Sequence, residues 1–180
     1  MNWQEVGDLI INLIDTDVLV RIRDKRESVK MYNRLIELGE IGSVRSVRQV
    51  FDELKGHGPA YKLLTDRRAL FSIPPEQQFC EGVQQKLELL GNKAGWLWEQ
   101  GGGKNPDPAD PWLVSVAAHY KYVVVTNESE FSTMRIPAAC KIPGIECRCI
   151  SGPHFLHEVG IIKTIKPEHI SAKAFFADKN

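Results

Sequence analysis

Two carboxylates end an apolar run near the N-terminus. The segment INLIDTDVLVRI, residues 11–22, places Asp15 and Asp17 directly after residues that are typical of a buried strand. Carboxylates are costly to desolvate, so a pair at the end of a buried strand needs a compensating partner. A metal ion is one candidate for that partner.

Three further acids hold comparable positions. Glu128 follows a second apolar segment, Asp110 lies near the start of a predicted helix, and Glu53 lies on another predicted helix. With Asp15 they offer four carboxylates, which are ample for one or two Mg²⁺ ions, because Mg²⁺ takes oxygen ligands and usually keeps several waters. Simpler interpretations stay open for two of them. Asp110 could satisfy only the free amides of its helix, and Glu53 could be a solvated helix residue.

The composition indicates one globular domain. With 180 residues, of which 43% are hydrophobic, the chain can bury roughly 70% of its unfolded surface. No apolar run approaches the roughly 20 residues that span a bilayer, and the N-terminal MNWQEVGD is acidic, so we expect a soluble, cytoplasmic protein with no membrane partner. Its four cysteines lack the density of a disulfide framework. The net charge is zero, so any binding of nucleic acid depends on local basic clusters.

Apolar runs and helix-terminating residues predict alternating strands and helices. We predict strands at 9–14, 69–74, 122–126 and 145–150, helices at 27–40, 46–56, 76–91, 109–120 and 152–160, and a loop at 91–110. Ser46 with Gln49 forms a candidate capping box, and Gly39 is a candidate C-cap. This alternation predicts an α/β protein with three layers, α/β/α, around a mainly parallel sheet. Such sheets bind ligands beyond the carboxyl ends of their strands, where both Asp15 and Glu128 fall.

Four segments, taken together, resemble a known superfamily. LIDTDVLV, VRQVFDEL, ADPWLVSVAAHY and YVVVTNESEF are similar in order and spacing to the PIN-domain superfamily, the fold of VapC-type toxin ribonucleases, and more closely to a PIN-like bacterial family known mainly from sequence. The resemblance covers roughly residues 9–157. The superfamily pattern has an Asp after the first strand, an acid on a middle helix, an Asp that opens a later helix, and a Thr-x-Asp-x-Asp-Phe segment. The matching residues here are Asp15, Glu53, Asp110, and Thr126 with Glu128 and Glu130 before Phe131.

The resemblance implies metal-dependent hydrolysis of RNA phosphodiesters. Asp15, Glu53, Asp110 and Glu128 would hold Mg²⁺ or Mn²⁺, and Thr126 would belong to the same catalytic site. A metal-bound water with a lowered pKa would attack phosphorus, while the ion neutralises charge on the leaving oxygen. The chain departs from the pattern where Glu replaces Asp at position 128, because Glu reaches one methylene further and alters the geometry at a metal. Asp17, Asp52 and Asp107 are near-duplicates that we expect to be supporting or surface residues.

The same resemblance implies partners and boundaries. It suggests the toxin of a bacterial toxin–antitoxin pair, with an antitoxin protein as a partner and a homodimer as the assembly. It also suggests a PIN-like nuclease domain over residues 1–160 and a C-terminal extension over residues 161–180.

An RNA substrate would be repelled by four carboxylates unless basic residues flank them. The basic candidates are Arg21, Arg23, Lys25, Arg26, Arg45, Arg48 and Lys104, although charge runs of this kind are more often solvated faces. Trp96, Trp98 and Trp112 could stack bases, with core packing as the alternative role. His57, between two glycines, is expected in a turn.

Two other functions stay open. The DTD motif after a strand also matches the nucleophile and acid of a haloacid-dehalogenase-type phosphohydrolase, for which Lys141 would be the lysine. That class needs a closing acidic pair, and only isolated acids follow Lys141. The second alternative is a catalytically inactive PIN-like module that binds a partner or nucleic acid without cutting it.

Overall fold

Four parallel strands form the central sheet. The computed structural model describes residues 10–23, 28–99 and 105–163. Its strands are β1 (Asn12–Ile14), β2 (Val44–Arg45), β3 (Val123–Thr126) and β4 (Arg148–Ser151). They are hydrogen-bonded in the order β2-β1-β3-β4, and every pair is parallel. The predicted α/β class and parallel sheet are confirmed.

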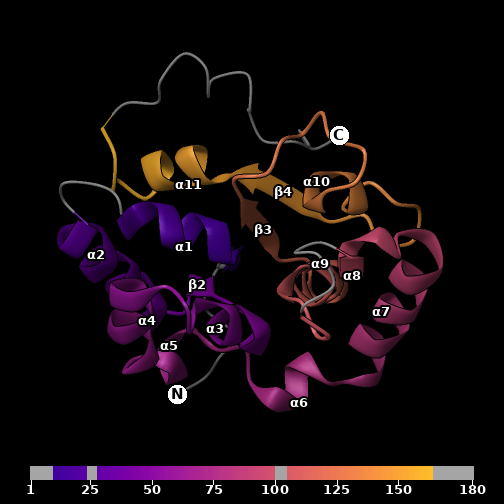
Figure 1. Ribbon diagram of the computed structural model, residues 1–180, viewed down its shortest axis with the longest axis horizontal. Coiled ribbons are helices and arrows are strands. Elements are labelled where there is room, and N and C mark those ends of the chain that lie inside the picture. Colours follow the sequence, from indigo (N-terminus) through magenta and orange to yellow (C-terminus); the bar gives the residue numbers. More distant parts are fainter. Residues whose placement is uncertain (1–9, 24–27, 100–104, 164–180) are drawn as a thin grey trace.

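Helices cover both faces of this sheet. Figure 1 shows α1 (Thr16–Arg23), α2 (Ser28–Glu40) and α11 (Gly152–Glu158) on one side. On the other side lie α7 (Glu81–Lys93), α8 (Trp96–Glu99), α9 (Ala109–Tyr120) and α10 (Ile136–Ala139). The short helices α3 (Arg48–Leu54), α4 (Gly58–Thr65), α5 (Arg68–Phe71) and α6 (Pro75–Gln78) lie beyond the β2 edge. The arrangement has the three layers expected from alternating strands and helices.

The strand order reverses direction beside β1. The chain moves outward from β1 to β2, then crosses back to β3 on the opposite side of β1. Because parallel crossovers are right-handed, the helices of the first crossover and those of the second cover opposite faces of the sheet. The connections that leave the carboxyl ends of β1 and β3 therefore diverge. This divergence opens a crevice between the two strand ends, the usual position of a ligand site in such sheets.

Helix α9 packs between β3 and α7 and is buried along most of its length. Leu113, Val114, Val116 and Ala117 are fully buried on it. The helix begins at the crevice, and Lys121, which follows its last residue, caps it in a left-handed conformation. Its packing holds the first turn, with Asp110, in place beside the sheet edge.

The region around β2 differs from the sequence prediction. The predicted strand at 69–74 is wrong: residues 68–71 form α5, and only Ser72 pairs with the sheet, through Ser46. Pro74 follows almost at once and cannot donate to a strand ladder, so the pairing ends there. The two-residue strand β2 itself was not predicted.

The predicted caps near β2 are also wrong. Ser46 is extended in a bridge with Ser72, and its hydroxyl donates to the carbonyl of Ile14, so it cannot cap α3. Gly39 lies inside α2, which continues to Glu40, and faces the buried ring of Phe71. In both places a tertiary contact overrides the local signal for a helix end.

The segment 76–91 was predicted as one helix and forms two. α6 ends at Gln78, whose side-chain oxygen accepts a hydrogen bond from the amide of Arg48. Phe79 then packs edge-on against Trp112, with ring centroids 5.2 Å apart, and Cys80 adopts the extended conformation that begins α7. The predicted loop at 91–110 contains the short helix α8.

The remaining observations concern the predicted C-terminal extension, the cysteines and the length of the helices. Of the predicted extension 161–180, the structure describes residues 161–163, and the amides of Ile161 and Ile162 donate to the carbonyl of Leu156. All four cysteines are free thiols. None of the described helices is long and apolar enough to cross a lipid bilayer.

A substitution at Gly152 tests how closely the side chains pack at the sheet edge. A Cβ at this position would lie 2.3 Å from the side-chain oxygen of Asn127 and 3.1 Å from a methyl carbon of Val18. We expect Gly152→Ala to lower the free energy of unfolding by about 1–3 kcal/mol through overpacking. Gly91→Ala is the control, because nothing lies within 4 Å of a Cβ there, in helix α7. It should raise stability by about 0.5–1 kcal/mol through helix propensity. Urea denaturation measures both, and equal effects would contradict the contact.

Candidate metal centre

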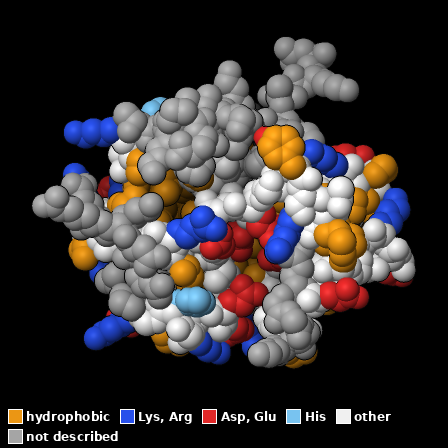
Figure 2. All heavy atoms as spheres, turned by 45° about the horizontal axis from the view of Figure 1, so that its top comes forward, with side chains coloured by type: hydrophobic (Ala, Val, Ile, Leu, Met, Phe, Trp, Pro, Cys, Tyr) orange, Lys and Arg blue, Asp and Glu red, His pale blue; other side chains and the backbone are white. Residues whose placement is uncertain are grey.

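A cleft of about 950 Å³ lies at the carboxyl ends of β1 and β3. Asp15, Glu53, Asp110 and Glu128 all line it, so the structure brings the four predicted acids to one site. Figure 2 shows acidic side chains gathered in a hollow, with basic side chains beside it. The crevice at the strand reversal is thus an acidic cleft.

Asp15 lies at the base of the cleft, immediately after β1. It is buried, with 5% of its surface exposed, and its amide continues the sheet by donating to the carbonyl of Val125. The hydroxyl of Thr126 donates to its carboxylate at 2.9 Å. Burial, and then repulsion from Glu128, Glu53 and Asp17, raises the pKa of Asp15 to about 7, although the Thr126 hydrogen bond opposes the rise.

Asp110 lies in the first turn of α9 and is half-buried on the wall of the cleft. Within the described part of the chain, no hydrogen bond reaches its carboxyl group. Burial, and then repulsion from Asp15, Glu128 and Glu53, raises the pKa of Asp110 to about 9. The simpler interpretation, in which Asp110 satisfies the amides of its own helix, does not describe this arrangement, because the amide of Ala109 donates to Glu53.

Glu53 connects three segments around the cleft. One carboxylate oxygen accepts from the hydroxyl of Thr16 at 2.5 Å, at the start of α1. The other accepts from the amide of Ala109 at 2.9 Å and from the side chain of Asn105 at 3.4 Å. Both oxygens are therefore engaged by the protein, and Glu53 holds the beginning of α9 against α1 and α3.

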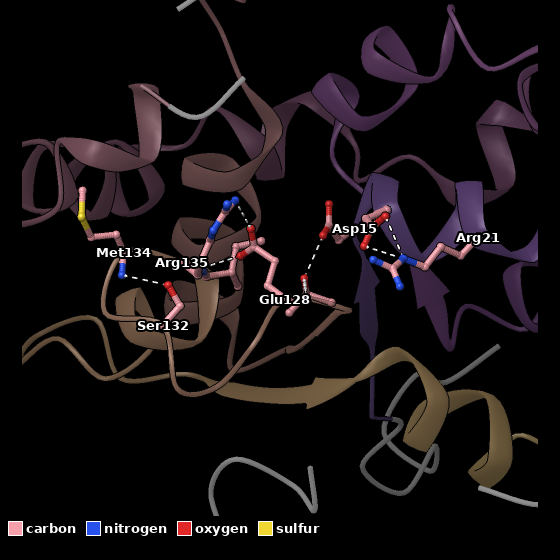
Figure 3. A network of polar contacts seen from close by, with 9 residues as sticks. Asp15, Arg21, Glu128, Ser132, Met134 and Arg135 are labelled. Carbon is pink, nitrogen blue, oxygen red and sulfur yellow. Dashed lines mark hydrogen bonds and ion pairs between the residues drawn. The ribbon is translucent and has the colours of Figure 1, made fainter. Parts of the chain in front are cut away.

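Glu128 is engaged in the same way. One oxygen accepts from the amide of Ile136 at 2.7 Å, and the other accepts from the guanidinium of Arg135 at 3.0 Å. The amide of Glu128 donates to the hydroxyl of Thr126, which fixes the start of this loop. Figure 3 shows Glu128 and Arg135 directed toward each other, with Asp15 across the gap. The long side chain of Glu128 carries its carboxylate to the beginning of α10.

The four acids thus differ in what they offer a cation. No three His, Cys, Asp or Glu side chains of the described residues are arranged so that they could hold a metal ion as they stand. Asp15 accepts one hydrogen bond and Asp110 none from that part of the chain, whereas both oxygens of Glu53 and of Glu128 are occupied. Mg²⁺ is usually bound by one or two carboxylates together with waters and substrate phosphates. Asp15 and Asp110 fit that small set of ligands.

A chain of polar contacts, buried at Gln78 and Gln49 and exposed at Asp107, supports the cleft and was not predicted from the sequence. The side chain of Gln78 donates to Gln49 at 2.7 Å, and Gln49 donates to the carboxylate of Asp107 at 2.8 Å. The indole of Trp112 donates to the other oxygen of Asp107, and the amide of Asp107 donates to Asn105. Gln49 is 2% exposed and is buried on α3 together with Val50, Phe51 and Leu54, and a buried glutamine needs hydrogen-bond partners.

Of the predicted basic residues, Arg21 lines the cleft, where its Nε lies 3.1 Å from both oxygens of Asp17. Arg45 instead donates to backbone carbonyls of Gly39 and Leu70, and exposed Arg48 pairs with Asp52. Lys25, Arg26 and Lys104 lie outside the described residues, and so does the side chain of Arg23. Arg135, which was not predicted, lines the cleft from the loop after β3.

The three predicted tryptophans have packing roles. Trp96, Trp98 and Trp112 are half-buried and pack against the core. His57 lies at the turn before α4, as predicted, and also lines the cleft.

Comparison with known proteins places the whole cleft within one sequence family. Residues 12–161 match the family described as a domain of unknown function, DUF4411. The chain belongs to this family. No curated protein matches the chain. The DUF4411 domain contains all four acids, Thr126 and both cleft arginines, so the site belongs to the family region rather than to the ends of the chain.

The raised pKa values of the DUF4411 site predict a pH dependence. Between the ordinary carboxyl pKa of 3.8 and the raised values, the folded protein binds more protons at Asp15 and Asp110 than the unfolded chain does. The contribution of this pair to stability is therefore present at low pH and is lost as the pH rises toward about 9. We expect Asp110→Asn to raise the free energy of unfolding by about 1–3 kcal/mol at pH 8 without divalent cations.

Urea denaturation in chelator at pH 5 and pH 8 tests this prediction. The Asp110→Asn protein should lose less stability between the two pH values than the wild type. Asp66→Asn, an exposed site at the end of α4, is the control and should follow the wild type. A wild-type pH dependence that persists unchanged in Asp110→Asn would contradict the assignment.

Proposed function

We propose that this DUF4411 domain is a metal-dependent ribonuclease that hydrolyses RNA phosphodiesters in the cleft between β1 and β3. One observation carries the proposal: Asp15 and Asp110, from separate segments, lie in one open cleft where burial and repulsion from neighbouring acids raise both pKa values. Strongly perturbed titratable groups in a cleft are typical of functional sites. The resemblance to the PIN superfamily supports the same reaction.

The donor set fits Mg²⁺ or Mn²⁺, because both prefer carboxylate oxygens and tolerate waters in the remaining positions. Bound between Asp15 and Asp110, such an ion would supply a water of lowered pKa and neutralise charge on the leaving oxygen. Thr126 orients the Asp15 carboxylate through its 2.9 Å hydrogen bond. Glu53 keeps Asp110 on the cleft wall by holding the first amide of α9. Arg21 and Arg135 offset part of the acidic charge that would otherwise repel RNA.

The phosphohydrolase alternative is less well supported by the cleft. A haloacid-dehalogenase-type site needs its lysine beside the nucleophilic Asp, but Lys141 is exposed and does not line the cleft. Asp17, which would be the general acid, is hydrogen-bonded by Arg21 through both oxygens. An inactive binding module would not need the buried carboxyl group of Asp15 and the half-buried one of Asp110, whose only described hydrogen-bond partner is Thr126.

The proposal includes a cellular role that the resemblance suggests: a cytoplasmic toxin, homodimeric, with a protein antitoxin as its inhibitor. A gene for a small DNA-binding regulator in the adjacent reading frame would support this role. Co-expression should then relieve growth arrest caused by the wild-type protein.

RNA cleavage tests the reaction. The purified full chain should degrade RNA with Mg²⁺ or Mn²⁺ and stop in excess chelator. Asp15→Asn and Asp110→Asn should each reduce the rate more than about 100-fold, beyond the 10–100-fold typical of residues that only support a ligand. Thr126→Val should fall within that 10–100-fold range, since it removes only the bond that orients Asp15. Asp66→Asn should keep full activity.

Two outcomes would overturn the ribonuclease proposal. One is RNA cleavage that persists in chelator or in Asp15→Asn. The other is turnover of a small phosphomonoester by the wild type that is lost in Asp17→Asn, because that pattern belongs to the phosphohydrolase.

A further inference from the structure

We propose that the loop formed by residues 128–135 binds the single-stranded RNA on which the domain acts, with Arg135 contacting a phosphate and Phe131 stacking on a base. This inference rests on the proposed ribonuclease function and assigns the substrate-binding element of the same cleft. The two contacting residues, Arg135 and Phe131, are not among the four acids of the cleft.

The loop is fixed at both ends by Glu128. Its carboxylate accepts from Arg135 and from the amide of Ile136, which brings the last residues of the loop back to the first. Inside the loop, the amide of Ser132 donates to the carbonyl of Ser129 at 3.2 Å. These contacts order a short segment beside the cleft, so its exposed side chains are presented with little conformational freedom to lose on binding.

Arg135 places positive charge in the cleft. Its side chain is 50% exposed although it pairs with Glu128, and it lines the same cleft as Asp15 and Asp110. Arg21 lines the cleft from α1, and Figure 3 shows the two arginines on opposite sides of Asp15. A guanidinium in this position suits a phosphate oxygen, because it offers a planar set of donors.

Phe131 is the most exposed of the large hydrophobic residues that the structure describes. Its surface is 81% exposed, and that of Met134 on the same loop is 53% exposed. The amides of both residues donate to serine hydroxyls two positions earlier, so the backbone is satisfied while the apolar side chains stay in solvent. An aromatic ring left in water beside the cleft arginines gains when a base stacks on it.

The chemistry beside Phe131 favours a base over a second phosphate. Glu130, half-exposed on the same loop, would repel a phosphate at that point, so the electrostatic contact falls to Arg135. Alternating cationic and aromatic contacts are the usual means of binding single strands without a fixed sequence. A duplex has its bases stacked internally and offers no free base face.

Binding measurements separate the two contacts. Anisotropy of a labelled single-stranded RNA of about 12 nucleotides is measured over a range of salt concentrations, in an Asp15→Asn background so that the RNA stays intact. Arg135→Gln should reduce the slope of log affinity against log salt by about 0.7, the value for one phosphate on a single strand. Phe131→Ala should weaken binding by roughly 5- to 150-fold with the slope unchanged. Phe131→Leu should be nearly as weak, since it restores apolar area but no ring.

The chain offers a matched control for Arg135. Arg34 on α2 has a side chain 48% exposed and pairs with Glu37 at 2.7 Å, yet it does not line the cleft. Arg34→Gln should change neither affinity nor slope. Thermal melts of each variant establish that it is folded.

Each outcome decides the inference independently of the ribonuclease proposal. An unchanged salt slope in Arg135→Gln, unchanged affinity in Phe131→Ala, or no RNA binding by the background protein would overturn it. If Phe131→Ala binds RNA normally, the exposed side chains of Phe131 and Met134 belong to a contact with another protein instead. Cleavage by the wild type in Mg²⁺ or Mn²⁺ decides the ribonuclease proposal separately, because the binding measurements do not require cleavage.

Discussion

The electrostatic cost of placing Asp15 and Asp110 in one cleft explains much of the surrounding structure. The two carboxyl groups come from the end of β1 and the beginning of α9, and burial, together with repulsion from neighbouring acids, disfavours their ionised forms. Neither could stay there without rigid support. Thr126 fixes Asp15 from β3, Glu53 fixes the first turn of α9, and the chain from Gln78 through Gln49 to Asp107 fixes the segment that leads into it.

The acids divide into two kinds, which sequence alone could not separate. All four were predicted as metal ligands, but both carboxylate oxygens of Glu53 and of Glu128 accept hydrogen bonds from backbone amides and neighbouring side chains. Asp15 and Asp110 keep most of their acceptor capacity. A glutamate is suited to the first task, because its longer side chain can reach a helix end from a neighbouring segment. The contacts of Glu128 with Arg135 and with the amide of Ile136 give it such a holding role.

The sequence predicted the fold best where burial is complete. β3 and α9 are buried along most of their length, so apolar patterning alone locates them, and the acids at their ends follow. It failed around β2, where two residues pair with the sheet and the decisive contacts are the Ser46 hydroxyl on Ile14 and the Arg45 guanidinium on carbonyls. Such contacts join residues far apart in the chain and leave no local periodicity. The engagement of Glu53 and Glu128 escaped prediction for the same reason.

Proton release links the affinity of the cleft for a cation to the stability of the metal-free fold. If Asp15 and Asp110 bind a divalent cation, they must do so as carboxylates, so binding displaces the protons that their raised pKa values retain. The affinity for the cation then rises with pH over the same range in which the metal-free protein loses stability. A cation that binds only the folded state restores stability in proportion to RT ln(1 + [L]/Kd). The repulsion that weakens the metal-free fold is therefore the same interaction that gives the cleft its attraction for a divalent ion.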